Sequence, residues 1–363
     1  MSILTHAPAT PADQLPPVPV VRRQARLDFA ELKYGLFLHY GLYSLLGRHE
    51  WVQQRERIRV ADYAKLADEF SADAFDATAW VDFARAAGMR YVNLTTRHHD
   101  SFCLWPTRQS DFHTGAAPKC RRDLVGELAE ACRAGGLGLC LYYSHGRDWR
   151  HPHAPNNDTH GYAARPEYDP PESVYATGAD HDLNRYVDFM AAQVEELLTD
   201  YGPITAIWLD GIATPLHPVG PDGNLRTDFD PRTEPDPFRC QALYDLIHGL
   251  QPNCLVSYKQ GYLGTEDFFA PEHRAYNRFG QPFGTDAGQV VGEICTTMID
   301  DPRSWGYIDD DNAHHLDADG VRKALNAAND AGCNLLLNTG PRPDGSLDPR
   351  DEKPLLEVGA TLG

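Results

Sequence analysis

The feature that most constrains the fold of this sequence is a regular alternation of short apolar runs with longer amphipathic segments. The short runs predict buried strands at 34–40, 91–95, 137–143, 204–209, 255–258, 292–296 and 334–338. Between them lie helical patterns at 61–70, 78–87, 124–134, 183–199, 238–250 and 321–331. Strands that alternate with helices pair in parallel. Seven strands are predicted, and an eighth is left undetected. This number favours a single α/β domain, a (β/α)8-like TIM barrel that is regular or irregular, over a doubly wound sheet.

Length and charge narrow the class of protein further. The 363 residues suit one large domain, and the net charge of −19 argues against nucleic acid or an anionic membrane as a partner. We predict a flexible N-terminal tail over residues 1–25 and a catalytic barrel over residues 26–363. The start of the chain lacks the basic and apolar pattern of a secretory signal. No apolar stretch approaches the roughly 18 residues of a membrane helix.

The eight cysteines are scattered and form no C-x-x-C pair, and several lie in apolar or helical stretches. We therefore expect reduced, buried thiols in a cytoplasmic protein and no disulfide framework. Two long segments with little predicted structure, 147–180 and 212–236, follow strand ends, and loops of this length are usually functional or disordered. The sequence leaves the oligomeric state open, with a homo-oligomer as one outcome.

One predicted strand ends in a carboxylate. The run 204–209 leads into Asp210 and Gly211, and Trp208 lies two positions before Asp210. Active sites of parallel α/β folds gather at the C-terminal ends of strands, and alternate side chains of a strand share a side. Asp210 is therefore a candidate nucleophile beside a ring that could stack on a sugar. The competing interpretation is an Asp that only caps the following turn.

Other strand ends carry polar clusters too. They include His39 with Glu50 and Trp51, the pair His98-His99, the run Leu141 to His145, and the acidic segment 265–273. Each cluster alone is ordinary, because loops are polar. Their recurrence at the same end of successive strands predicts one shared site.

Several motifs, in the same order, resemble the α-L-fucosidase family, glycoside hydrolase family 29, from about Lys33 to Leu355. They are Lys33-Tyr-Gly-Leu-Phe-Leu-His-Tyr-Gly-Leu-Tyr-Ser44, the run Leu94 to Trp105, Asp123 to Leu128, Ser304 to Tyr307, and Asn334 to Pro341. The family usually carries a C-terminal β-sandwich after its barrel. The printed sequence stops about twenty residues past Pro341, so we expect the barrel domain without that sandwich, acting on small imported sugars.

The resemblance implies a role for each matching position. Asp210 corresponds to the catalytic nucleophile. A sugar needs hydrogen-bonding edges and an apolar face, and histidine, carboxylate and aromatic side chains supply both. The residues that the resemblance implies in sugar binding are His39, Glu50, Trp51, His98, His99, Tyr142, Trp208 and Lys259. Lys259 stands where many relatives place an arginine, so the paired donors of a guanidinium are lost there.

The acid/base is less well marked. The segment Glu266-Asp-Phe-Phe-Ala-Pro-Glu272 resembles the segment in which one branch of the family places this residue, which favours Glu272. Glu266 and Glu293 remain alternatives, although Glu293 lies in a block that is common to the family and has a structural interpretation.

A metal site at His98-His99 is disfavoured, because adjacent side chains on an extended chain point apart and the H-x-H spacing of metallohydrolases is absent. We expect no metal and no cofactor. The predicted activity is retaining exo-hydrolysis of terminal α-L-fucosides. The alternatives are a glycosidase for a related sugar such as an α-L-galactoside, a transfucosidase, and a sugar-binding protein without catalysis.

Overall fold

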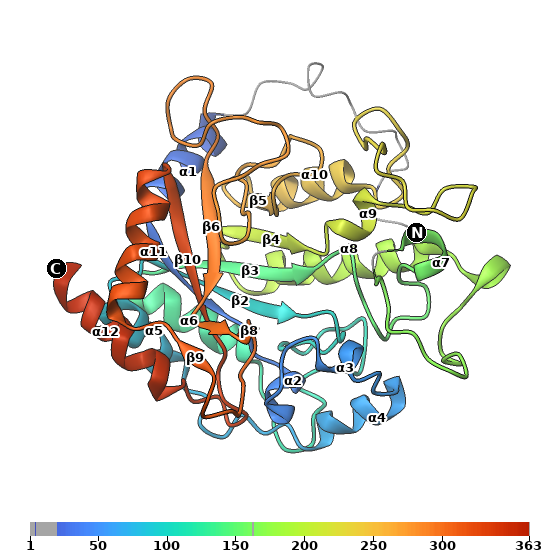
Figure 1. Cartoon of the computed structure of the whole chain (residues 1–363), viewed down its shortest axis with the longest axis horizontal. Coiled ribbons are helices and arrows are strands. Elements are labelled where there is room, and N and C mark those ends of the chain that lie inside the picture. The colour runs from blue at the N-terminus through green and yellow to red at the C-terminus, as the bar shows by residue number, and fades with distance from the viewer. Residues whose placement is uncertain (1–3, 5–19, 162, 363) are drawn as a thin grey trace.

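The computed structural model describes residue 4, residues 20–161 and residues 163–362. Parallel strands form one curved sheet in the order β5-β4-β3-β2-β1-β10-β6 (Figure 1). They are β1 (Tyr34–Leu38), β2 (Tyr91–Arg97), β3 (Gly138–Ser144), β4 (Ala206–Asp210), β5 (Leu255–Tyr258), β6 (Gly292–Thr297) and β10 (Cys333–Thr339). These strands occupy the seven runs that the sequence indicated, so the predicted α/β barrel class is confirmed.

The segment 267–273 closes the gap between β5 and β6. On one side the amide of Asp267 donates to Val256 at 2.8 Å, and the carbonyl of Lys259 accepts from Ala270 at 2.7 Å. On the other side the carbonyl of Phe269 accepts from Glu293 at 2.9 Å. This segment therefore takes the place of the eighth strand. Its pairing is limited to isolated bridges, and Pro271 cannot donate to the ladder, which is why the sequence pattern did not reveal it.

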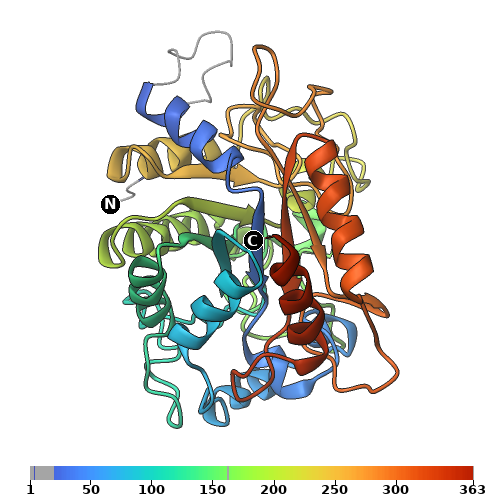
Figure 2. The ribbon, with the colours of Figure 1, turned by 90° about the vertical axis from the view of Figure 1, so that its left-hand side faces the viewer.

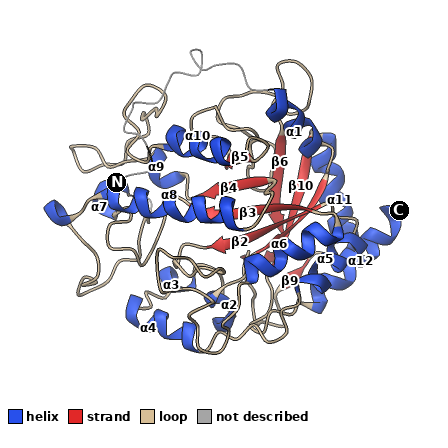
Figure 3. Ribbon diagram, turned by 180° about the vertical axis from the view of Figure 1, so that it is seen from behind, coloured by secondary structure: helices blue, strands red, loops and turns tan. Residues whose placement is uncertain are grey.

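Helices cover the outside of the barrel, as Figures 2 and 3 show. The long ones are α5 (Ala77–Ala86), α6 (Leu124–Gly135), α8 (Leu183–Asp200), α10 (Cys240–Leu250), α11 (Ala318–Asp330) and α12 (Pro349–Leu362). An aspartate caps the N-terminus of four of them and accepts from a free backbone amide; the caps are Asp76, Asp123, Asp182 and Asp317. Between β5 and β6 the described chain has no helix, so the barrel is irregular.

Two apolar clusters divide the core. The larger one lies between the sheet and its helices, and a second cluster fills the barrel with inward side chains of the strands, among them Phe37 and Trp208. Phe29 belongs to this inner cluster and packs on Tyr91 and Phe268, with ring centroids 5.3 and 4.5 Å apart. Its helix thus packs against the barrel interior and adds to the core.

That helix, α1 (Val20–Ala30), differs from the predicted N-terminal tail of residues 1–25. Residues 20–25 form its first turns, and the rest of the predicted tail, apart from Leu4, lies outside the described residues. Arg22 and Arg26 are one helical turn apart and both reach the buried carboxylate of Asp267, at 3.1 and 2.7 Å. Ion pairing to the barrel therefore orders a segment whose composition predicted a tail.

Short elements surround the C-terminal ends of the strands (Figure 1). They are α2 (Leu42–Leu46), α3 (Val52–Arg55), α4 (Val60–Ala64), α7 (Asn157–His160), α9 (Ala213–Leu216), two 3-10 turns (Lys65–Asp68 and Gly178–Asp180) and a small antiparallel sheet of β7 (Ile299–Asp301), β8 (Arg303–Ser304) and β9 (His314–His315). The long segment 147–180 is ordered by contacts to this layer, since Tyr168 donates to the carbonyl of Ile58 at 2.7 Å. None of the described helices is long and apolar enough to cross a membrane.

Candidate active site

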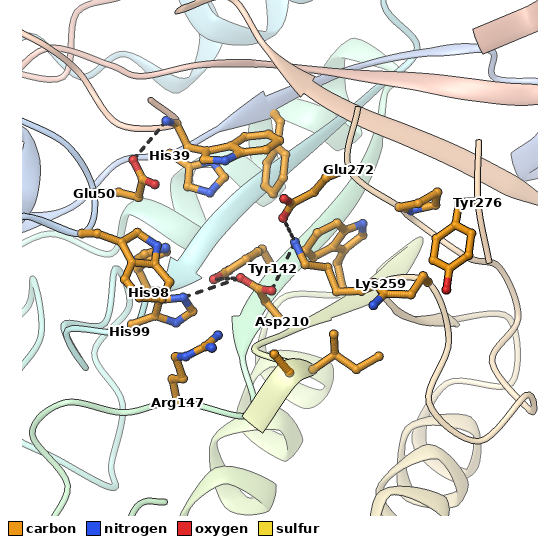
Figure 4. A pocket seen from close by; sticks show the side chains of 18 of the residues that line it. His39, Glu50, His98, His99, Tyr142, Arg147, Asp210, Lys259, Glu272 and Tyr276 are labelled. Carbon is orange, nitrogen blue, oxygen red and sulfur yellow. Dashed lines mark hydrogen bonds and ion pairs between the residues drawn. The ribbon is translucent and has the colours of Figure 1, made fainter. Parts of the chain in front are cut away.

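A cavity of about 430 Å³ opens at the C-terminal ends of the barrel strands (Figure 4). It brings together ten of the residues that the sequence indicated, from six different strand ends and loops. They are His39, Glu50, Trp51, His98, His99, Tyr142, Trp208, Asp210, Lys259 and Glu272. Glu266 and Glu293 are not among the lining residues.

Asp210 is the last residue of β4 and faces this cavity. Its Oδ2 accepts from the Tyr142 hydroxyl at 2.7 Å, and its Oδ1 accepts from the Gly211 amide at 2.6 Å and lies 3.2 Å from Lys259 Nζ. Burial alone raises the pKa of Asp210, but the Lys259 ammonium and these hydrogen bonds outweigh burial and hold it well below its usual range. Asp210 is therefore a fully ionised carboxylate at any ordinary pH.

The turn after Asp210 requires glycine. Gly211 has φ +85°, a conformation that L side chains rarely adopt. A Cβ on Gly146, which follows β3, would meet the Gly211 carbonyl oxygen at 2.2 Å. The amides of His145 and Gly146 both donate to the Asp210 carbonyl, at 3.0 and 2.9 Å. Backbone contacts between two neighbouring strand ends thus fix the position of the carboxylate.

Lys259 connects the two candidate catalytic carboxylates. It follows β5, and its Nζ contacts both Asp210 and the Oε1 of Glu272. The nearest oxygens of the two carboxylates are therefore at most about 6 Å apart, one ammonium between them. The Lys259 ammonium also lies over the Trp208 ring, 4.8 Å from its centroid. Burial works against the charged ammonium, but both carboxylates raise the pKa of Lys259 well above its usual range.

Glu272 differs in environment from Asp210. It lies next to the end of the segment 267–273, and its side chain is 42% exposed, against 14% for Asp210. The pair thus combines a largely shielded, permanently charged carboxylate with one that solvent reaches more freely.

Glu293 lies inside the barrel, below the cavity. Its two oxygens accept from the Trp208 indole N–H at 2.9 Å and from the Tyr91 hydroxyl at 2.5 Å. Burial raises the pKa of Glu293 to about 7. The carboxyl group therefore orients Trp208, whose ring stacks on Tyr142 with centroids 5.6 Å apart.

Glu266 is also buried away from the cavity. Its Oε1 accepts from the Tyr244 hydroxyl and from the amides of Tyr262 and Leu263, and its Oε2 accepts from the Gly264 amide. These four bonds hold the tight turn between β5 and the segment 267–273. Of the three candidate acids, only Glu272 faces the cavity.

His39 presents a hydrogen-bond acceptor. The amide nitrogen of Asn338 donates to the Trp305 carbonyl at 2.7 Å, so its oxygen accepts from His39 Nδ1 at 2.6 Å. Burial lowers the pKa of His39 to about 3, which keeps the ring neutral. Its Nε2 is consequently unprotonated and suited to accept from a ligand hydroxyl.

His99 also presents an unprotonated Nε2 as a hydrogen-bond acceptor. Ser144 donates to the Arg147 carbonyl at 2.7 Å, so its oxygen accepts from His99 Nδ1 at 2.6 Å. Burial holds the pKa of His99 well below its usual range, so the 3.8 Å approach of Nε2 to Asp210 Oδ2 joins two acceptors and is no ion pair. A donor hydroxyl placed beside Asp210 would satisfy Nε2.

His98 and His99 both line the cavity, although adjacent side chains were expected to point apart. β2 ends at Arg97, so the alternation of a strand does not extend to the pair, and their ring centroids lie 4.2 Å apart. His98 stacks on Tyr142, and its buried Nδ1 has no hydrogen-bond partner in the described part of the chain. Within residues 20–161 and 163–362, no group of three or more His, Cys, Asp or Glu side chains is arranged to hold a metal ion.

Glu50 and Trp305 line one wall together. The Oε2 of Glu50 accepts from the amides of Trp305 and Gly306, at 3.0 and 3.1 Å, and burial raises the pKa of Glu50 to about 7. The Trp305 ring lies beside His39, with centroids 5.3 Å apart. Sequence reasoning noted Trp305 only as part of a shared block, although an aromatic residue inside a matched motif was a signal for the site.

Arg147 and Tyr276 are further lining residues that sequence reasoning missed. The Arg147 guanidinium lies over the Trp51 ring, 5.1 Å from its centroid, and burial lowers the pKa of Arg147. Arg147 opens a long segment after β3, and Tyr276 belongs to a loop after Glu272. Loops of this kind carry no periodic pattern, so neither residue had a signal of its own.

Comparisons with known proteins agree with this geometry. A model of the family described as Alpha-L-fucosidase matches residues 12–363. The chain belongs to the alpha-L-fucosidase family. The bovine tissue alpha-L-fucosidase is 28% identical over 353 residues, which cover 92% of this chain and 66% of the bovine protein. The chain thus spans less than two thirds of that relative's length.

Solved structures of family members resemble the whole fold. Alpha-L-fucosidase isoenzyme 1 from Paenibacillus thiaminolyticus superposes with a TM-score of 0.76 at 31% identity, over 94% of this chain and 76% of that one. The alpha-L-fucosidase AlfC from Lactobacillus casei, in complex with its α-L-fucose product, gives a TM-score of 0.75 at 28% identity, over 93% and 98%. The described residues of this chain end in the barrel helix α12.

Proposed function

We propose that this protein is a retaining exo-α-L-fucosidase in which Asp210 is the nucleophile and Glu272 the acid/base. The observation that carries the proposal is the pair itself: an ionised Asp210 and a solvent-accessible Glu272, both in contact with Lys259 in a cavity lined by histidine and aromatic side chains. Retaining glycosidases separate these groups by about 5–5.5 Å and inverting ones by about 6.5–9.5 Å. The shared ammonium keeps the nearest oxygens within about 6 Å of each other, which supports the retaining arrangement over the inverting one.

In the first step an Asp210 oxygen attacks the anomeric carbon as the bond from that carbon to the glycosidic oxygen breaks. Glu272 gives its proton to the departing oxygen, so the leaving group departs as an alcohol. The Tyr142 hydroxyl and the Gly211 amide hold Asp210 in one orientation for the attack. A nucleophile that is ionised and fixed before the substrate arrives needs little reorganisation.

In the second step Glu272, now a carboxylate, takes a proton from water as the oxygen of that water attacks the anomeric carbon. The ester bond to Asp210 breaks, and the sugar leaves with its original anomeric configuration. The exposed side of Glu272 gives water access to the ester.

The lining supports a sugar as ligand. The unprotonated Nε2 atoms of His39 and His99 accept from ring hydroxyls, while Trp208 and Trp305 offer apolar ring surface to C–H groups. AlfC has been solved with α-L-fucose, and an AlfC variant with 4-nitrophenyl-α-L-fucopyranoside. We extend that sugar to this cavity as part of the proposal.

Turnover of an aryl α-L-fucoside by the wild type, Asp210→Gly and Glu272→Ala tests the proposal, each with and without azide. In Asp210→Gly, azide should restore turnover and give the β-fucosyl azide, because one displacement inverts the anomeric carbon. In Glu272→Ala, azide should give the α-fucosyl azide, because the ester to Asp210 forms first.

Glu293→Gln is the matched control, since this carboxyl group lies outside the cavity lining. It should give no azide adduct. An inactive wild type, or the same anomer from both active-site variants, would contradict the assignment.

We also propose a cytoplasmic location. All eight cysteines have free, buried thiols in the structure, which supports a reducing compartment. Fractionation of the native cells with an antibody against the chain tests this, and recovery of the protein outside the cytoplasm would refute it.

A further inference from the structure

The rim of the cavity next to Glu272 is unlike the rest of its lining. The chain that follows Glu272 supplies Arg274 and Tyr276. Gln260 follows Lys259, and its carbonyl accepts from the Arg278 amide at 3.0 Å, which joins it to this segment. Figure 4 places Tyr276 on the far side of Lys259 and Glu272 from the histidines. This rim is therefore separate from the residues that surround Asp210.

Tyr276 is a large aromatic residue that is accessible to solvent. Half of it is accessible, whereas the aromatic residues nearer Asp210, Tyr142 and Trp208, are 1% accessible each. Among described residues, its only recorded ring contact is the Arg274 guanidinium, 5.9 Å from the ring centroid. The chain thus holds an apolar ring and a cation at the edge of its reaction cavity.

The chemistry of the proposed reaction decides what must lie at this rim. Glu272 protonates the glycosidic oxygen, so the leaving group has to extend from Glu272 toward solvent. Trp208 and Lys259 occupy the inner side, with the ammonium over the indole. A departing group therefore passes the side that carries Tyr276 and Arg274.

We propose that Tyr276, with Arg274 and Gln260, forms a leaving-group subsite that takes a second pyranose. The Tyr276 ring stacks on the apolar C–H face of that sugar, as exposed aromatic side chains do with amphipathic ligands. The guanidinium and the amide donate to its hydroxyl or acyl oxygens. This inference rests on the proposed fucosidase function and adds the residues that recognise the leaving group.

Two kinds of substrate separate the subsite from the reaction centre. α-L-Fucosyl fluoride carries no second sugar, while a panel of fucosyl disaccharides of different linkage, Fucα(1,6)GlcNAc among them, carries one. For Tyr276→Ala we expect kcat/KM on the best disaccharide to fall by roughly two- to tenfold. On the fluoride, kcat/KM should stay within about twofold of the wild type, because the ring contacts only the leaving sugar.

Tyr276→Phe keeps the ring and should retain most of the disaccharide activity. Leu356→Ala, an exposed apolar residue of α12, is the control for surface truncation and should change neither substrate. Equal losses on both substrates in Tyr276→Ala, or no loss on the disaccharide, would overturn the subsite. So would a wild type that cleaves the fluoride and none of the disaccharides. A wild type that is inactive on the fluoride as well would overturn the fucosidase proposal itself.

Discussion

Replacing Lys259 by methionine removes the ammonium that Asp210 and Glu272, the two proposed catalytic carboxylates, share. The ammonium lies 3.2 Å from Asp210 Oδ1, and a unit charge at this distance contributes about 5 kcal/mol at an effective dielectric constant of 20. Because burial also disfavours the carboxylate, we expect most of this energy to appear in the titration, as a rise of about three to four units in the pKa of Asp210.

The direction of the pH effect follows from the proposed role of Asp210 as nucleophile. Asp210 acts only as a carboxylate, and in the wild type its pKa is well below the usual range, so acid should not protonate it above pH 3. In Lys259→Met the higher pKa should create a new acid limb, along which kcat/KM falls as the pH decreases. The assay is kcat/KM for an aryl α-L-fucoside from pH 3 to pH 8.

Lys259→Arg is the matched control. It keeps the charge, so the new acid limb should be absent even if the longer side chain lowers the rate at every pH. Acid limbs that coincide in the wild type and Lys259→Met would refute the view that this ammonium holds Asp210 ionised. The hydrogen bonds of Asp210 would then suffice.

Three further predictions concern the surrounding network. Tyr142→Phe removes the 2.7 Å hydrogen bond to Asp210 and should lower kcat/KM by about 10- to 100-fold, which is the range for a hydrogen bond to a charged group. An unchanged kcat/KM would show that this hydrogen bond is dispensable. Glu293→Ala leaves the indole N–H of Trp208 without an acceptor and should lower the free energy of unfolding in urea by about 2–4 kcal/mol, while the shape of the pH–activity profile stays that of the wild type. Several buried histidines have a pKa of about 3 to 4, against about 6.5 in the unfolded chain, so protons bind the unfolded state more readily. The free energy of unfolding should therefore fall as the pH drops from 6.5 toward 4. A urea midpoint that is flat or rises over this range would contradict the burial of these histidines in the neutral form. These histidines are His39, His49, His145 and His160.

Burial of Glu50 and Glu293 acts in the opposite direction. Their pKa of about 7 means that the folded state holds their protons between about pH 4.5 and 7, which favours folding at the acid side of that range. Buried Asp100, with a pKa of about 6, acts in the same direction as Glu50 and Glu293. Carboxylates with a lowered pKa, such as Asp148 and Asp210, add to the effect of the histidines, so we expect the net effect of acid to be destabilising.

Local sequence patterns were sufficient to predict features that depend on a single strand or helix. The run before Asp210 is apolar enough to be a buried strand in any α/β context, and alternation along β4 places Trp208 and Asp210 on the same side, where both line the cavity. Short motifs at other strand ends likewise identified His39, His98 and Tyr142. A parallel barrel brings all such ends to one face.

Features that depend on packing between distant segments escaped this reasoning. Segment 267–273 completes the barrel only because β5 and β6 stand on either side of it, and its own sequence, interrupted by Pro271, has no strand pattern. Likewise α1 is held by the reach of Arg22 and Arg26 to Asp267, which lies more than 240 residues away in the chain.

The choice among the three acidic residues shows this division most clearly. By sequence alone, this chain determined a barrel with a carboxylate at the end of its fourth strand and a histidine-rich, aromatic set of partners around it. The family resemblance favoured Glu272, but Glu266 and Glu293 remained alternatives, because a side chain's surroundings are absent from its local pattern. Tertiary structure satisfies Glu266 with backbone amides, seals Glu293 beneath Trp208 and leaves Glu272 facing solvent beside Lys259. Burial and partners, which distant segments supply, give each of these identical groups a different chemistry.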